Sequence, residues 1–212
     1  MHFIYFLMPL LWLLLFSPLN SSGQEICIRD GFSPNEWLVV GQKFEHSTHI
    51  ESFPIHLIEA RKYVGIVEVT KNSSPDIDRW LRYCGLNPGN PYCASFVSTM
   101  IGEAKVKAPK IRSGLARKFI TPKSIPAGKV LLGMIKIEPG AIIVWQNGNT
   151  IFGHVGFVIK WDKDKGTTVE ANTGKSNRGS QSDGEGVWKR SRAIVPGNMF
   201  RITYFTKVSY KE

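Results

Sequence analysis

Charged residues are absent from the start of the chain, because no Asp, Glu, Lys or Arg precedes Glu25. Residues 3–16 are apolar throughout, yet this run is shorter than the span of about 20 residues that a membrane helix needs, and it contains Pro9. Small polar residues follow it. We therefore predict a signal peptide over residues 1–23 and a secreted or periplasmic mature protein. His2 stands where Lys or Arg usually precedes the apolar core, so an uncleaved membrane anchor is the alternative.

Cysteine is scarce as well, and the residues present are Cys27, Cys84 and Cys93. Their number is odd, so at least one thiol has no partner within the chain. In an oxidising compartment Cys27 and Cys84 could pair and leave Cys93 free. Two other pairings are equally compatible with the sequence.

Acidic residues are too few to balance the basic ones. The chain has 27 Lys and Arg against 17 Asp and Glu, which gives a formal net charge of +10, and residues 1–23 contribute none of it. A basic surface suits an anionic partner such as cell wall, phospholipid or nucleic acid. The basic residues are scattered and no recognition motif accompanies them, so we expect no nucleic-acid partner and favour contact with an anionic cell wall.

The length fits one domain of ordinary size with additional segments, and no internal repeat is visible. We expect an N-terminal extension over 24–56 and a catalytic domain over 57–212. The periodicity predicts three helices first, at about 57–69, at 76–84 and from Tyr92 onward. Apolar runs bounded by turn residues then predict strands at 141–145, 153–161, 167–172 and 199–208. This order indicates an α+β fold in which N-terminal helices pack on an antiparallel sheet.

Three histidines, His46, His49 and His56, cluster in the extension. A metal site needs more ligands at tetrahedral spacing, and no nearby cysteine supplies them. We therefore expect surface histidines and no metal ion.

Cys93 lies at a loop-to-helix junction. Pro88, Gly89 and Pro91 mark the loop, and the apolar residues that follow recur at helical spacing, with Cys93 in the first turn. Free backbone N–H groups and the positive end of the helix dipole favour a thiolate there and could hold an oxyanion. An isolated cysteine at a helix start is more often structural, so a catalytic role also requires a base and an orienting group elsewhere.

The predicted hairpin over 153–172 supplies such groups. Strand alternation places His154 on one face, and Glu170 and Asn172 share a face of the next strand. With a turn at 162–166, counting predicts Asn172 opposite Gly156, diagonal to His154, and Glu170 opposite Val158. A slip by two residues would exchange the roles of Glu170 and Asn172.

Four separated motifs in this order resemble the CHAP amidohydrolases/peptidases, which are related to papain and NlpC-type enzymes. They are Gly89-Asn-Pro-Tyr-Cys93-Ala-Ser-Phe-Val, Pro139-Gly140 before an apolar strand, Gly153-His154-Val-Gly, and Glu170-Ala-Asn172-Thr. The resemblance covers about residues 57–208 and implies a papain-like cysteine hydrolase architecture. One departure is Ala141, where the family usually has an acidic residue after the Pro-Gly turn.

Carried over, the resemblance implies Cys93 as nucleophile, His154 as general base, and Glu170 and Asn172 as its orienters, without metal or cofactor. The implied activity is cleavage of amide bonds in peptidoglycan by a monomer, as an N-acetylmuramoyl-alanine amidase or as an endopeptidase. The alternatives are a non-catalytic domain of the same fold that binds cell wall or a partner, and an effector or toxin amidase aimed at a rival cell.

Overall fold

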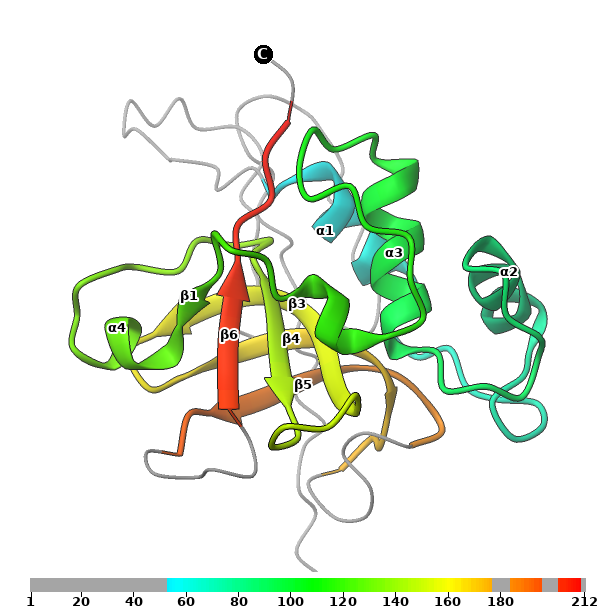
Figure 1. The fold of residues 1–212 in the computed structure, drawn as a ribbon. Coiled ribbons are helices and arrows are strands. Elements are labelled where there is room, and N and C mark those ends of the chain that lie inside the picture. The colour runs from blue at the N-terminus through cyan, green and yellow to red at the C-terminus, as the bar shows by residue number, and fades with distance from the viewer. Residues whose placement is uncertain (1–52, 177–183, 196–201, 211–212) are drawn as a thin grey trace, which may run out of the picture. The chain divides into compact units, whose positions relative to one another are not determined.

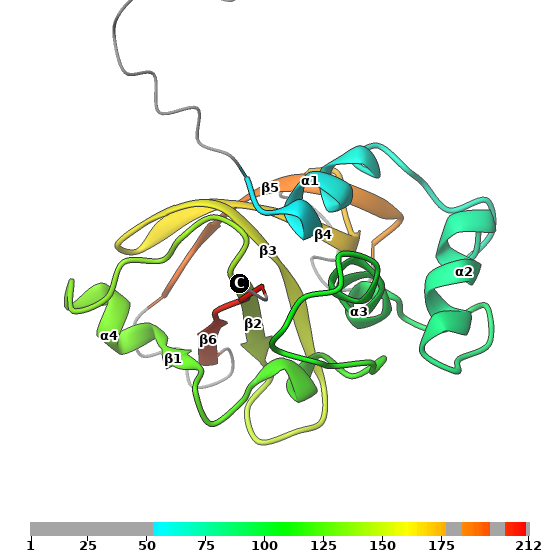
Figure 2. The same cartoon turned by 90° about the horizontal axis from the view of Figure 1, so that it is seen from above.

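The computed structural model describes residues 53–176, 184–195 and 202–210, which all belong to one compact unit, Ile50–Glu212. Figure 1 and Figure 2 show its ribbon from two directions. The predicted signal peptide, Cys27, His46 and His49 lie outside the described residues. Within the described ranges, no helix is long and apolar enough to cross a membrane.

Three helices precede the sheet, as the sequence predicts: α1 (Ile55–Lys62), α2 (Pro75–Tyr83) and α3 (Cys93–Glu103). Helix α2 begins at Pro75 because Ser74 is its N-cap, with the hydroxyl accepting a hydrogen bond from the Ile77 N–H. A 3-10 helix, η1 (Ala116–Phe119), and the short α4 (Ala127–Leu131) follow.

The first helix ends earlier than predicted. Gly65 has a φ of 99°, a conformation that glycine adopts readily and that ends helical structure. The Gly65 N–H then donates to the Val187 carbonyl at 2.9 Å, and the Val187 N–H donates to the Ile66 carbonyl at 2.9 Å. The predicted helix over 57–69 is therefore wrong beyond Lys62, because the later residues pair with a strand that is distant in the sequence.

One six-stranded antiparallel sheet carries the described strands, in the order β1-β6-β2-β3-β4-β5. The strands are β1 (Ile125–Pro126), β2 (Ile142–Gln146), β3 (Gly153–Asp162), β4 (Lys165–Thr173), β5 (Gly186–Ala193) and β6 (Ile202–Thr206). The predicted α+β fold, with helices first and an antiparallel sheet after them, is confirmed. The sequence did not predict β5, whose alternating positions carry several cations in place of apolar residues.

Two apolar clusters lie on the sheet. Val144, Val155 and Phe157 belong to the same cluster as Leu57 of α1 and Phe96 of α3. The neighbouring residues in β2 and β3 belong to the second cluster, which includes Ile143, Trp145, Val158 and Phe205. This division follows from the two-residue period of a strand. Each large side chain buried in this way contributes about 1.5–3 kcal/mol to folding, so α3 and β3 are fixed against one another.

The β3–β4 hairpin has, next to His154, the register of the alternative that is slipped by two residues, so the first predicted register was wrong. Gly156 pairs with Glu170, and Val158 pairs with Thr168. Part of the shift arises at the turn, where Asp162 pairs directly with Lys165. The rest arises at a bulge between Val158 and Lys160, which inserts an extra residue into β3. The result is that Glu170, not Asn172, is the diagonal neighbour of His154.

His56 was predicted to lie on the surface and is instead fully buried. Its Nε2–H donates to the Gly140 carbonyl at 2.8 Å, and the Tyr210 hydroxyl, 2.5 Å away, donates to Nδ1. Burial lowers the pKa of His56, partly offset by the hydrogen bond to Gly140. The prediction failed because periodicity gives no sign that the C-terminal segment returns to cover α1.

Candidate active site

Cys93 is the first residue of α3 and is 6% exposed. The helix begins where the Phe96 N–H donates to the Tyr92 carbonyl at 2.9 Å. The N–H groups of Cys93, Ala94 and Ser95 therefore precede the first bond within the helix. These donors and the helix dipole favour negative charge at this position. The predicted place of Cys93 in the first turn of a helix is confirmed.

The loop before Cys93 is fixed by the segment after α1. The Asn72 side-chain amide donates to the Gly89 carbonyl at 3.1 Å, and the Gly89 N–H donates to the Asn72 carbonyl at 3.2 Å. Glu68 accepts from the Asn72 N–H at 2.8 Å and from the Tyr92 hydroxyl at 3.1 Å. Because Tyr92 is the residue before Cys93, these bonds fix the point at which α3 begins.

His154 is the second residue of β3 and is 2% exposed. Its Nε2 lies 2.9 Å from Oε2 of Glu170, while Nδ1 has no hydrogen-bond partner within the described residues. The ring also interacts with the Cys93 thiol. Burial opposes protonation, but the contacts with Cys93 and Glu170 outweigh it and raise the pKa of His154 to about 9. The imidazole thus has the carboxylate at Nε2, and Nδ1 is the nitrogen left for the thiol.

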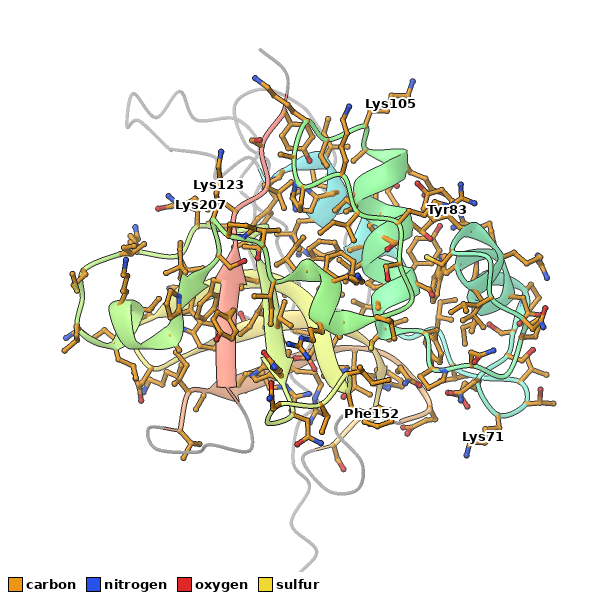
Figure 3. All side chains as sticks on the ribbon, viewed as in Figure 1. Lys71, Tyr83, Lys105, Lys123, Phe152 and Lys207 are labelled. Atoms are coloured by element: carbon orange, nitrogen blue, oxygen red, sulfur yellow. The ribbon has the colours of Figure 1, made fainter. Side chains whose placement is uncertain are left out.

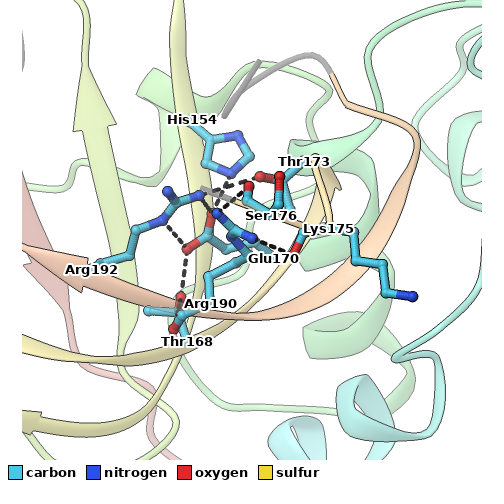
Figure 4. A network of polar contacts seen from close by, with 8 residues as sticks. All are labelled: His154, Thr168, Glu170, Thr173, Lys175, Ser176, Arg190 and Arg192. Atoms are coloured by element: carbon cyan, nitrogen blue, oxygen red, sulfur yellow. Dashed lines mark hydrogen bonds and ion pairs between the residues drawn. The ribbon is translucent and has the colours of Figure 1, made fainter. Parts of the chain in front are cut away.

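Glu170 has an exposed fraction of 0% and lies in a network of polar contacts that Figure 4 shows. The Arg192 guanidinium bonds both of its oxygens, with Nε 2.7 Å from Oε1. The Thr168 hydroxyl also donates to Oε1. Burial alone would favour the neutral acid, but Arg192 and then His154 lower the pKa of Glu170 to about 2. Glu170 is therefore a buried carboxylate that stays ionised.

Asn172 lies at a second bulge, where its φ is 58° and the ladder passes from Ala171 directly to Thr173. The Asn172 N–H donates to the Tyr92 hydroxyl, and its carbonyl accepts from the Gly184 N–H at 3.1 Å. The backbone of Asn172 thereby ties β4 to the start of α3. The role of Asn172 as an orienter of His154 stays a prediction.

A cavity of about 460 Å³ opens beside Cys93. It lies between the loop that leads into α3, residues 112–116 and the turn from β2 to β3. Three apolar side chains line it and are largely exposed: Leu115 (45%), Ile151 (59%) and Phe152 (68%). Figure 3 labels Phe152. Another cavity, of about 410 Å³ and lined by Lys105 and Lys110 among others, does not include Cys93. A substrate could therefore reach the thiol from the first cavity.

His154 connects three of the four predicted site residues, because it bonds Glu170 and interacts electrostatically with Cys93. Sequence reasoning missed Trp145, whose ring stacks on His154 with centroids 5.6 Å apart, and Arg192. The sequence carries no local signal for Arg192, because the four residues 189–192 are all polar and show no apolar alternation. Among the described residues, no group of three His, Cys, Asp or Glu side chains could hold a metal ion.

The chain was compared with models of known protein families, and part of it matches one of them. Residues 85–172 match the family model described as CHAP domain. The matched segment contains Cys93, His154, Glu170 and Asn172, and it ends before β5. CHAP domains are generally cysteine- and histidine-dependent amidohydrolases of the peptidoglycan amidase or peptidase type. Comparisons with curated proteins and with solved structures gave no significant match.

Proposed function

We propose that this chain is a cysteine hydrolase that cleaves amide bonds in peptidoglycan, because residues 85–172 match the CHAP domain family model. One observation carries the proposal: the Cys93 thiol at the start of α3 interacts with an imidazole whose Nε2 lies 2.9 Å from a buried carboxylate. A nucleophile, a base and an orienting group in contact are what acyl transfer through a covalent intermediate needs.

The proposed reaction begins when His154 takes the proton of the Cys93 thiol. The sulfur attacks the carbonyl carbon of the amide, a C–S bond forms, and the carbonyl electron pair moves to oxygen, where the Cys93 N–H stabilises the oxyanion. The intermediate collapses, the C–N bond breaks, and the imidazolium protonates the leaving amine. His154 then removes a proton from water, which hydrolyses the thioester and regenerates the thiol. Glu170 holds the imidazole through both steps, and no metal or cofactor takes part.

The substrate class is supported by the cavity and by charge. The cavity beside Cys93 has apolar side chains at its rim, which suits a peptide with apolar side chains such as alanine. The formal net charge of +10 favours approach to an anionic wall. Residues 1–23 would act as a signal peptide and direct the protein to that wall. We propose that it acts there as a monomer. The scissile bond is either the amide between sugar and peptide or a bond within the peptide.

The test is mass analysis of the muropeptides released from purified peptidoglycan by the protein without residues 1–23. A new N-terminal alanine with a free lactyl carboxyl identifies an amidase, and a cut within the peptide identifies an endopeptidase. The Cys93→Ala variant is the control and should release neither product. A folded wild-type protein that binds the wall without releasing products would contradict the proposal and favour a wall-binding domain. Comparing walls from the producing cell and from other bacteria tests the effector alternative.

A further inference from the structure

Arg192 lies on β5, outside the segment that matches the CHAP family model, and it reaches the centre of the site. It contacts Glu170 through two nitrogens, Nε to Oε1 and Nη2 to Oε2, and its Nη2 lies 3.2 Å from the Thr173 hydroxyl. Its side chain is 11% exposed, and Glu170 is 0% exposed. A two-point contact of this kind fixes both the distance and the plane of the carboxylate.

The charges in the site explain why a cation is needed there. In the reactive state the Cys93 thiolate, the His154 imidazolium and the Glu170 carboxylate together carry one net negative charge. All three side chains are nearly or fully buried, and an uncompensated buried charge is strongly unfavourable. The Arg192 guanidinium compensates this negative charge at the carboxylate itself, and the Arg190 guanidinium adds a weaker electrostatic interaction with Glu170. Without Arg192, Glu170 would tend to take up a proton and lose its attraction for the imidazolium.

Arg192 also supports the other side of the imidazole. Its guanidinium carbon lies 5.5 Å from the centroid of the Trp145 ring, and that ring stacks on His154 at an interplanar angle of 25°. The same side chain therefore contacts the carboxylate that bonds His154 and the indole that packs against it.

We propose that Arg192 is a positioning residue of the hydrolase, which keeps Glu170 ionised and aligned so that His154 presents its other nitrogen to Cys93. This inference rests on the proposed function, because it assigns a role to Arg192 within the same site. Arg192 belongs to β5, so this positioning residue lies outside the segment that matches the family model.

The experiment uses the rate at which iodoacetamide alkylates Cys93 near pH 6, in protein that carries Cys27→Ser and Cys84→Ser. This readout needs no peptidoglycan and is followed by intact mass. We expect Arg192→Gln to slow alkylation by about tenfold, which corresponds to one unit in the pKa of the supporting imidazole. Arg192→Lys should recover part of the rate, because it restores the charge without the two-point contact.

Two controls separate a positioning role from a structural one. Arg190 is a buried arginine on the same face of β5 that bonds the carbonyls of Lys175 and Ser176, each at 2.7 Å. Arg190→Gln should slow alkylation clearly less than Arg192→Gln does, since Arg190 acts on Glu170 through its charge, whereas Arg192 also bonds both carboxylate oxygens. In a Glu170→Gln background, Arg192→Gln should have little further effect, because the carboxylate that needs the cation is gone.

The proposal is overturned if folded Arg192→Gln protein is alkylated at the wild-type rate, or if its loss is equally large in the Glu170→Gln background. If Arg192→Gln does not fold, the same comparison is made with Arg192→Lys, and a wild-type rate in that variant overturns the two-point alignment. If Arg192→Gln slows alkylation but the wild-type protein releases no muropeptides, the proposed function is contradicted and the positioning role of Arg192 stands.

Discussion

Nε2 of His154 lies 2.9 Å from Oε2 of Glu170, and the exposed fractions of the two side chains are 2% and 0%. Since Glu170 is ionised, Nε2 is the nitrogen that carries the hydrogen. In the neutral ring Nδ1 is then the acceptor, which a general base for Cys93 requires. The contact between these two residues therefore selects the tautomer on which the proposed mechanism depends.

Replacing Glu170 with glutamine keeps a hydrogen-bond acceptor near Nε2 but removes the negative charge. We expect Glu170→Gln to reduce kcat/KM for peptidoglycan by about 10- to 100-fold. The pKa of His154 should fall from about 9 towards its ordinary value of 6.5, so the alkaline limb of the pH–rate profile moves to lower pH. Glu103→Gln is the matched control, because Glu103 forms an exposed ion pair with Arg79. An unchanged profile in Glu170→Gln would contradict the orienting role.

The His154–Glu170 pair should make stability depend on pH. The pKa of His154 is raised to about 9, so its contribution is complete below 6.5 and is lost as pH rises through 9. The pKa of Glu170 is lowered to about 2, so its contribution is complete above 4.5 and is lost as pH falls towards 2. The difference in unfolding free energy between wild type and His154→Gln should be largest between pH 4.5 and 6.5. Denaturant titrations at several pH values measure this difference, and a constant difference would show that the pair does not titrate on unfolding in this range.

His56 should have the opposite effect on acid stability. Burial lowers its pKa, so its contribution to stability is present above pH 6.5 and is lost as pH falls below that value. We expect wild type to lose more unfolding free energy than His56→Gln does between pH 7 and pH 5. Both ring nitrogens of His56 are hydrogen-bonded, so the substitution should itself cost about 1–3 kcal/mol at pH 7. Parallel acid dependence in the two proteins would show that His56 does not titrate in this range.

The cavity beside Cys93 should bind substrate through its apolar rim. Phe152 is 68% exposed and lines this cavity, so Phe152→Ala should raise KM while leaving kcat nearly unchanged. The expected loss is about 1 kcal/mol of binding, or a roughly fivefold rise in KM. Met134→Ala is the control, because Met134 is 66% exposed and does not line the cavity. Equal kinetics in Phe152→Ala and wild type would place the substrate elsewhere.

Local signals were sufficient to predict much of the fold and the first two members of the site. Pro91 and the helical spacing after it place Cys93 correctly, because both effects act within a few residues. Glycines and apolar alternation likewise predict β3, and with it the strand position of His154.

Local signals could not predict the register of β3 and β4, the contact of Arg192 with Glu170, or the burial of His56. Which residue faces His154 depends on a bulge at Ile159 and on a tight turn, neither of which has a distinct sequence mark. Arg192 reaches Glu170 only because β5 pairs with β4, a contact between segments that are separated along the chain. His56 is buried by Tyr210, which is 154 positions away.

The activation of Cys93 by His154 can be measured as the rate at which Cys93 is alkylated in a Cys27→Ser, Cys84→Ser background. The rate constant is measured from pH 5 to 9 by intact mass, in protein with His154 and in protein with His154→Gln. We expect fast labelling at pH 6 with His154 and at least a tenfold lower rate without it, since a free thiol with a pKa of about 8.5 is almost fully protonated there. Equal rates in the two proteins at pH 6 would contradict the activation of Cys93 by His154.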